Sequence, residues 1–230
     1  MRMFRENYKI LIPPSANGDA AVLIHGLFAG AFILRRMADF FLREGYRIFL
    51  YDYPTRRKEI RAHCSALADF LHSDMFDSCG KIHFITHSMG GLLLRGAVGG
   101  LLEKRSAQLG RAVMIAPPNR GSDLAAMAVK LVPGAGRIVA PIHDLSSAPD
   151  SFANVLPVPE NMPETGIIAA SHDHQVRTAY THLSGEKDHI VLRGTHTGIL
   201  FRRETAQEAC HFIKFGKFRE ETHDNGRNQN

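Results

Sequence analysis

Residues 81–94 read KIHFITHSMGGLLL, and this stretch decides the fold of the chain. The run from Lys81 to Thr86 is mostly apolar and rich in isoleucine, which predicts a buried strand. The segment from Met89 to Leu102 is rich in glycine and leucine and carries almost no charge, which predicts a helix packed closely under a sheet. Ser88 therefore stands at the junction between a buried strand and a buried helix.

A serine at such a junction occupies the position of a nucleophile, because a sharp strand-to-helix turn holds its hydroxyl clear of the sheet. Gly90, two residues on, leaves room for the strained turn. The usual pattern is Gly-x-Ser-x-Gly, and Thr86 replaces its first glycine. We expect the larger side chain to leave less space between this position and the neighbouring chain, without changing the chemistry.

Further strands and helices alternate on both sides of this junction. We predict strands at 20–24, 46–51, 112–116, 166–170 and 189–192, and helices at 33–44 and 57–72 and around Ala206–Ile213. This alternation predicts an α/β fold with a mainly parallel central sheet and helices on both faces. We expect residues 1–218 to form a single domain and the polar residues 219–230 to form a disordered tail.

The stretch from Ser122 to Pro163 breaks the alternation, because it holds most of the prolines and has no clear period. Two interpretations stay open: a lid-like insertion that forms a substrate wall, or a long surface connection. Four apolar residues of this stretch would suit an acyl chain but would equally suit a core: Leu131, Val132, Ile138 and Val139.

Composition excludes several other classes of protein. The net charge of +5 comes from scattered lysines and arginines with only short clusters, such as Arg56–Lys58, and no nucleic-acid-binding motif accompanies them. We therefore expect a solvated surface and no nucleic-acid partner, with a loose attraction to anionic lipid surfaces left open. The three cysteines lack CxxC spacing, and no signal peptide or membrane span is evident, so a cytoplasmic location is predicted. Nothing in the sequence indicates the oligomeric state.

Four segments together resemble the α/β-hydrolase superfamily, in particular small bacterial lipases and esterases, and the likeness runs from about Ala20 to Phe215. His25-Gly26-Leu27 resembles the oxyanion loop of lipases, and His87–Gly91 resembles their nucleophile elbow. Residues 116–122, APPNRGS, are similar to the loop after the next strand, and residues 196–199, HTGI, are similar to the catalytic-histidine segment. The resemblance implies a hydrolase that cleaves carboxylic esters of a small molecule or a lipid.

A serine nucleophile needs a base and an acid, which in this superfamily follow it in the order acid, then histidine. His196 fits the base, because it lies between the last predicted strand and the C-terminal helix. Asp173 fits the acid, because it follows the strand at 166–170 and its segment resembles the acid loop of the family. Asp188 begins a strand, which places it at the opposite edge of the sheet, so we favour Asp173.

Two backbone N–H groups should stabilise the oxyanion: that of Met89 and that of Leu27, with Phe28 as the alternative donor in the first loop. His25 is expected to support this loop. A metal site at His172-Asp173-His174 is disfavoured because no third ligand is suggested nearby. We expect no metal and no cofactor. An acyltransferase and a non-catalytic binding protein of the same fold remain the alternative functions.

Overall fold

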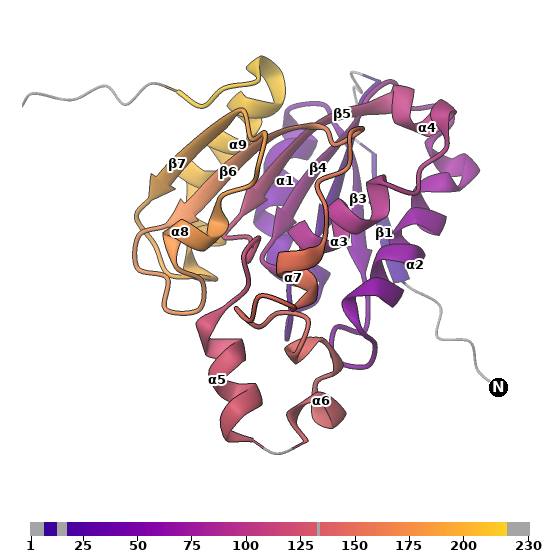
Figure 1. The fold of residues 1–230 in the computed structure, drawn as a ribbon. Helices are drawn as coiled ribbons and strands as arrows, with labels where there is room; N and C mark the ends of the chain where they lie inside the picture. The colour runs from indigo at the N-terminus through magenta and orange to yellow at the C-terminus, as the bar shows by residue number, and fades with distance from the viewer. Residues whose placement is uncertain (1–6, 13–17, 133, 220–230) are drawn as a thin grey trace, which may run out of the picture.

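The computed structural model describes residues 7–12, 18–132 and 134–219, which surround a seven-stranded sheet with the strand order β1-β3-β2-β4-β5-β6-β7 (Figure 1). The strand β1 pairs antiparallel with β3, and every other pairing is parallel. The strands are β1 (Asn7–Leu11), β2 (Ala20–Ile24), β3 (Arg47–Asp52), β4 (Ile82–His87), β5 (Leu109–Ile115), β6 (Glu164–Ala170) and β7 (Asp188–Leu192). The predicted mainly parallel α/β fold is confirmed.

The helices cover both faces of this sheet. They are α1 (Arg35–Arg43), α2 (Ile60–His72), α3 (Met89–Val98), α4 (Glu103–Gln108), α5 (Asp123–Leu131), α6 (Ala135–Ile138), α7 (Phe152–Val155), α8 (Thr178–Thr181) and α9 (Arg203–Phe215). Short 3-10 turns are η1 (Ala31–Leu34), η2 (Asp74–Phe76), η3 (Ala140–Ile142) and η4 (Gly198–Phe201).

Alternate residues of each central strand feed two separate cores. On β2, Val22 packs into the core shared with α2 and α3, whereas Leu23 packs into the core shared with α1 and α9. Because successive side chains of a strand point to opposite faces, a strand covered on both sides must be apolar throughout. This requirement explains the uninterrupted apolar runs from which the strands were predicted.

Two features depart most clearly from the sequence-based prediction. The helix expected over 89–102 ends at Val98, and α4 begins separately at Glu103, because Gly99 and Gly100 destabilise a continuous helix at this point. The strand β1 was not anticipated, and it adds an antiparallel edge to the sheet. The predicted disordered tail lies, apart from Arg219, outside the described residues.

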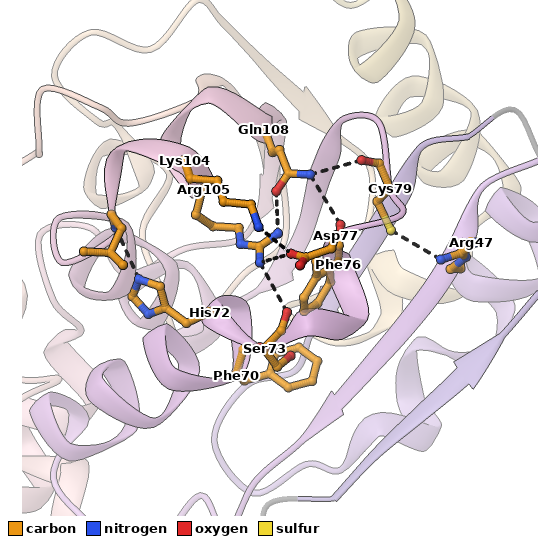
Figure 2. A network of polar contacts seen from close by, with 11 residues as sticks. Arg47, Phe70, His72, Ser73, Phe76, Asp77, Cys79, Lys104, Arg105 and Gln108 are labelled. Atoms are coloured by element: carbon orange, nitrogen blue, oxygen red, sulfur yellow. Dashed lines mark hydrogen bonds and ion pairs between the residues drawn. The ribbon is translucent and has the colours of Figure 1, made fainter.

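The start of β4 is held by a polar network at the amino edge of the sheet (Figure 2). Asp77 forms ion pairs with Lys104 at 3.1 Å and with the buried Arg105 at 2.8 Å, which join the turn after η2 to α4. The Gln108 amide donates hydrogen bonds to the carbonyls of Phe76 and Cys79. These contacts fix the turn that leads into the strand carrying Ser88 at its other end.

The residues from Ser122 to Pro163 lie between β5 and β6 and contain α5, α6, η3 and α7. The helices α5 and α6 extend beyond the carboxyl edge of the sheet (Figure 1). In the described part of the chain, no helix combines the length and the apolar character needed to cross a bilayer.

Candidate active site

Ser88 forms the sharp turn between β4 and α3. Its backbone has φ 52° and ψ −126°, in a region that side-chain-bearing residues rarely adopt, and its N–H donates to the Ile115 carbonyl at 2.9 Å. A Cβ atom at Gly90 would lie 2.5 Å from the Ile24 carbonyl oxygen, so only glycine fits there. The glycine two residues after Ser88 therefore lets α3 begin directly against the end of β2.

Thr86 is fully buried between β2 and β5, where its register partners are Ile24 and Met114. A Cβ atom at Gly91 would lie 3.5 Å from Thr86 Oγ1 and 3.2 Å from Pro117 Cβ. The tightest contact of such a Cβ atom would be with Pro117, whereas its distance to Thr86 Oγ1 is that of an ordinary van der Waals contact.

His196 lies between Ser88 and Asp173, although 108 residues separate it from the serine in the chain. Its Nε2 is 2.9 Å from Ser88 Oγ, and its Nδ1 is 2.6 Å from Asp173 Oδ2. The side chains of His196 and Asp173 are only 7% and 1% exposed, so water competes little for these hydrogen bonds. The structure thus brings together the three residues that the sequence singled out.

The Asp173 carboxylate is held as an anion by its surroundings. Its Oδ1 accepts the backbone N–H groups of Gln175 at 2.8 Å and Val176 at 2.9 Å. Burial raises the pKa of Asp173, but the hydrogen bond from His196 and these two backbone donors outweigh burial and lower the pKa overall. A buried carboxylate that stays ionised can orient an imidazole and stabilise its protonated form.

Asp188 is the first residue of β7. Among the residues that the structure describes, it forms no hydrogen bond with His196. Its carboxylate accepts the backbone N–H groups of His189 and Phe218, each at 2.8 Å. In the segment after β5, Asp144 likewise accepts the Ile60 N–H at 2.8 Å. Both carboxylates therefore secure backbone segments away from Ser88.

The loop after β2 approaches Ser88 closely. A Cβ atom at Gly26 would lie 2.8 Å from Ser88 Cβ, so this position also requires glycine, for a reason that only the folded chain reveals. The Phe28 N–H, the alternative donor of the loop, is already engaged, because it donates to Thr55 Oγ1 at 3.2 Å. Met89 is the first residue of α3, so its N–H has no acceptor within the helix.

The same loop is anchored from β3. Asp52 Oδ1 lies 2.8 Å from His25 Nε2 and accepts the Ala31 N–H at 3.1 Å. The Tyr53 hydroxyl donates to the His25 carbonyl at 2.7 Å, and the two rings stack at 4.5 Å. His25 thus supports the loop, and Asp52 and Tyr53 are supporting residues that no sequence pattern singled out.

His87 is a further supporting residue, to which the sequence analysis assigned no role. Its Nε2–H donates to the His196 carbonyl at 2.9 Å, and the two rings are 4.9 Å apart. Burial, together with nearby His196, lowers the pKa of His87 to about 3, so the ring is neutral at physiological pH. The residue before the nucleophile therefore holds the loop that carries His196.

Three buried histidines predict a loss of stability in mild acid. Burial lowers the pKa of His63 and of His83 to about 4, and that of His87 to about 3. Below the ordinary histidine pKa of 6.5, these histidines bind protons in the unfolded chain but stay neutral in the folded protein. The free energy of unfolding therefore falls as the pH falls from about 6.5 to about 4. Each histidine removes up to about 1.4 kcal/mol per pH unit from the free energy of unfolding in this window.

Urea unfolding at several pH values from 7.5 to 4.5 measures this effect. The variant His63→Phe keeps a ring against Tyr53, whose centroid is 4.9 Å away, and should reduce the pH slope by one histidine's share. A free energy of unfolding that stays constant over this window would contradict the prediction.

His172 and His174, considered above for a metal, flank Asp173 on the exposed side of its loop. His172 Nδ1 is hydrogen-bonded to Ser171 Oγ at 2.7 Å. The described residues contain no group of three or more histidine, cysteine, aspartate or glutamate side chains placed to hold a metal ion.

Comparisons with known proteins agree with this architecture. A family model described as "Alpha/beta hydrolase family" matches residues 21–206. A lipase from Bacillus licheniformis superposes with a TM-score of 0.70 at 16% identity, over 84% of this chain and 92% of the lipase. A lipase-esterase related protein from Clostridium acetobutylicum superposes with a TM-score of 0.65 at 14% identity, over 90% of this chain and 99% of that protein.

A thermophilic esterase from Thermogutta terrifontis gives a TM-score of 0.59 at 13% identity, over 91% of this chain and 93% of the esterase. No curated protein sequence matches the chain. At these sequence identities, the likeness to solved structures shows a shared fold and nothing more.

Proposed function

The chain belongs to the alpha/beta hydrolase family, and on that premise we propose that it is a serine hydrolase that cleaves carboxylic esters through an acyl-enzyme intermediate. The observation that carries the proposal is the position of His196, whose two ring nitrogens lie 2.9 Å from Ser88 Oγ and 2.6 Å from Asp173 Oδ2. A serine hydroxyl becomes an effective nucleophile when a histidine in this position removes its proton.

In the proposed reaction, His196 Nε2 takes the proton from Ser88 as Oγ attacks the ester carbonyl carbon. Asp173 accepts the Nδ1–H of His196 and stabilises the imidazolium that forms. The Leu27 and Met89 N–H groups donate to the oxyanion, and the loss of one such donor typically costs about 3 kcal/mol of transition-state stabilisation. His196 Nε2–H then protonates the leaving alcohol.

Water completes the cycle. His196 removes a proton from a water molecule, the hydroxide attacks the acyl carbon, and the carbonyl-bound Oγ leaves as the Ser88 hydroxyl with a proton returned by His196. All proton transfers pass through one side chain, so this chemistry needs neither metal nor cofactor. Hydrolysis differs from acyl transfer only in whether water or another acceptor attacks.

Labelling with a fluorophosphonate tests the proposal. Because the reagent phosphonylates an activated serine, the folded protein should be labelled stoichiometrically, and mass spectrometry should place the label on the peptide that contains Ser88. The heat-unfolded protein is the control and should not react. A folded protein that does not label, or that labels at another serine, would refute the assignment.

Hydrolysis of p-nitrophenyl esters of increasing chain length then defines the substrate class. A preference for acetyl or butyryl esters assigns an esterase, and a preference for long acyl chains assigns a lipase. Leu131, Val132 and Ile138, whose side chains the sequence left open between a core and an acyl-chain surface, are 68%, 46% and 69% exposed and so lie outside the core, whereas Val139 is half-buried.

A further inference from the structure

The helix α5 turns its apolar stripe away from the protein. Leu124, Met127 and Leu131 follow the spacing i, i+3, i+7, so they lie on one side of the helix, and they are 47%, 53% and 68% exposed. Ala125 points to the other side and is the buried residue of the helix. A surface helix normally buries its apolar stripe against the core, so this helix presents the face that most helices hide.

Other exposed apolar residues lie in segments at the same edge of the sheet. Val132, after α5, and Ile138, on α6, are exposed, Ile138 by 69%. Phe28 and Phe32, in the segment after β2, are also exposed. Since β2 and β4 are parallel neighbours, the segments that follow them meet at the carboxyl edge, beside Ser88.

The base of α5 is attached to the loop that carries Asp173. Ser122 Oγ donates to the Gln175 carbonyl at 2.6 Å and also caps α5 by accepting the Ala125 N–H at 3.3 Å. Asp123 forms an ion pair with Arg177 at 2.6 Å. The first turn of the helix that carries the outward stripe is therefore anchored to the loop of Asp173.

Basic residues accompany this apolar surface. Lys130 follows Met127 on α5, Arg137 precedes Ile138 on α6, and both are exposed. The basic loop after β3 lies beside them, because the Ala140 N–H donates to the Arg56 carbonyl at 3.0 Å. Arg56 and Lys58 of that loop are exposed, with Glu59 as its acidic residue.

We propose that α5, α6 and the loop 56–58 dock this protein onto an anionic lipid bilayer. The exposed apolar side chains of α5 and α6 would enter the boundary between head groups and acyl chains, while the nearby Lys130, Arg137 and loop 56–58 attract the anionic head groups. A second copy of the chain is a poorer occupant, because a twofold contact through this patch would bring its basic residues together. Docking goes beyond the proposed ester chemistry and does not require Ser88 to react.

Co-sedimentation of the full chain with vesicles tests the proposal, using phosphatidylcholine alone and phosphatidylcholine mixed with phosphatidylglycerol. We expect binding to the mixed vesicles that weakens with added salt, and much weaker binding to phosphatidylcholine alone. Leu131→Asp should lower the partition coefficient by about tenfold or more, because it places a charge where the acyl chains would lie. Lys130→Gln combined with Arg137→Gln should reduce the salt-dependent part.

Leu102→Asp is the matched control, because Leu102 is 67% exposed and precedes α4 at the opposite edge of the sheet. It should bind vesicles like the wild type, and circular dichroism should give unchanged melting for both aspartate variants. Absence of binding to mixed vesicles, equal binding to both vesicle types, or equal losses from Leu131→Asp and Leu102→Asp would each overturn the proposal.

Light scattering without lipid distinguishes the rival occupant. If the wild type is a dimer that Leu131→Asp dissociates, and if it does not bind vesicles, the patch contacts a second copy of the chain. That result would overturn docking on lipid. Ser88→Ala should bind vesicles as the wild type does. A failure of serine labelling with intact vesicle binding would therefore refute the ester chemistry alone.

Discussion

Replacing Ser88 with alanine is expected to lower kcat for p-nitrophenyl ester hydrolysis by about 10⁶-fold, which is the loss that removal of the nucleophile causes in a serine protease. The effect is this large because His196 would have no hydroxyl to deprotonate, although the oxyanion donors would remain. Alanine differs from serine by one atom and has the same Cβ, so the φ of 52° is no more strained than before. We therefore expect the melting temperature to change little.

Ser65→Ala is the matched control for this measurement. Ser65 is exposed on α2, and its Oγ donates only to the Arg61 carbonyl at 3.3 Å. This variant should retain wild-type turnover. If Ser88→Ala keeps more than a few per cent of the activity while remaining folded, another residue must be the nucleophile.

Replacing Asp173 with asparagine should lower kcat by about 10⁴-fold, which corresponds to about 5.5 kcal/mol of transition-state stabilisation. An asparagine amide that donates toward His196 Nδ1 forces the proton onto Nε2, where the ring can no longer accept the Ser88 proton. The charge that stabilises the imidazolium is lost as well. Because the size of the side chain is retained, KM should change far less than kcat.

Asp188→Asn provides the comparison, because Asp188, like Asp173, lies in the C-terminal half of the chain and accepts two backbone N–H groups. We expect it to lower stability, with little effect on kcat of the folded fraction, since its carboxylate does not contact His196. Circular dichroism measures the folded fraction of both variants, by which kcat is corrected. The reverse ranking of the two variants would transfer the role of the acid to Asp188.

Much of the fold follows from local patterns in the sequence. Apolar runs such as residues 20–24 predict strands because a sheet covered on both faces leaves no position for polar side chains. The candidate residues Ser88, Asp173 and His196 could be selected because each follows a strand, and parallel strands deliver the residues after them to one edge. The sequence located the end of α3 less accurately, because a glycine such as Gly99 can lie within a helix or end it.

The sequence by itself determined the alternation of the central strands and helices, and it singled out Ser88, Asp173 and His196 as candidate site residues. Only the tertiary structure decided which groups support them: Thr55 beside Phe28, Asp52 beside His25, and His87 behind His196. It also decided that residues 123–131 form a helix whose apolar stripe points outward, in a stretch where the sequence shows no clear period. The physical reason is the same in each case. Periodicity is a property of neighbouring residues, whereas contacts across the sheet edge depend on loops that no local pattern specifies.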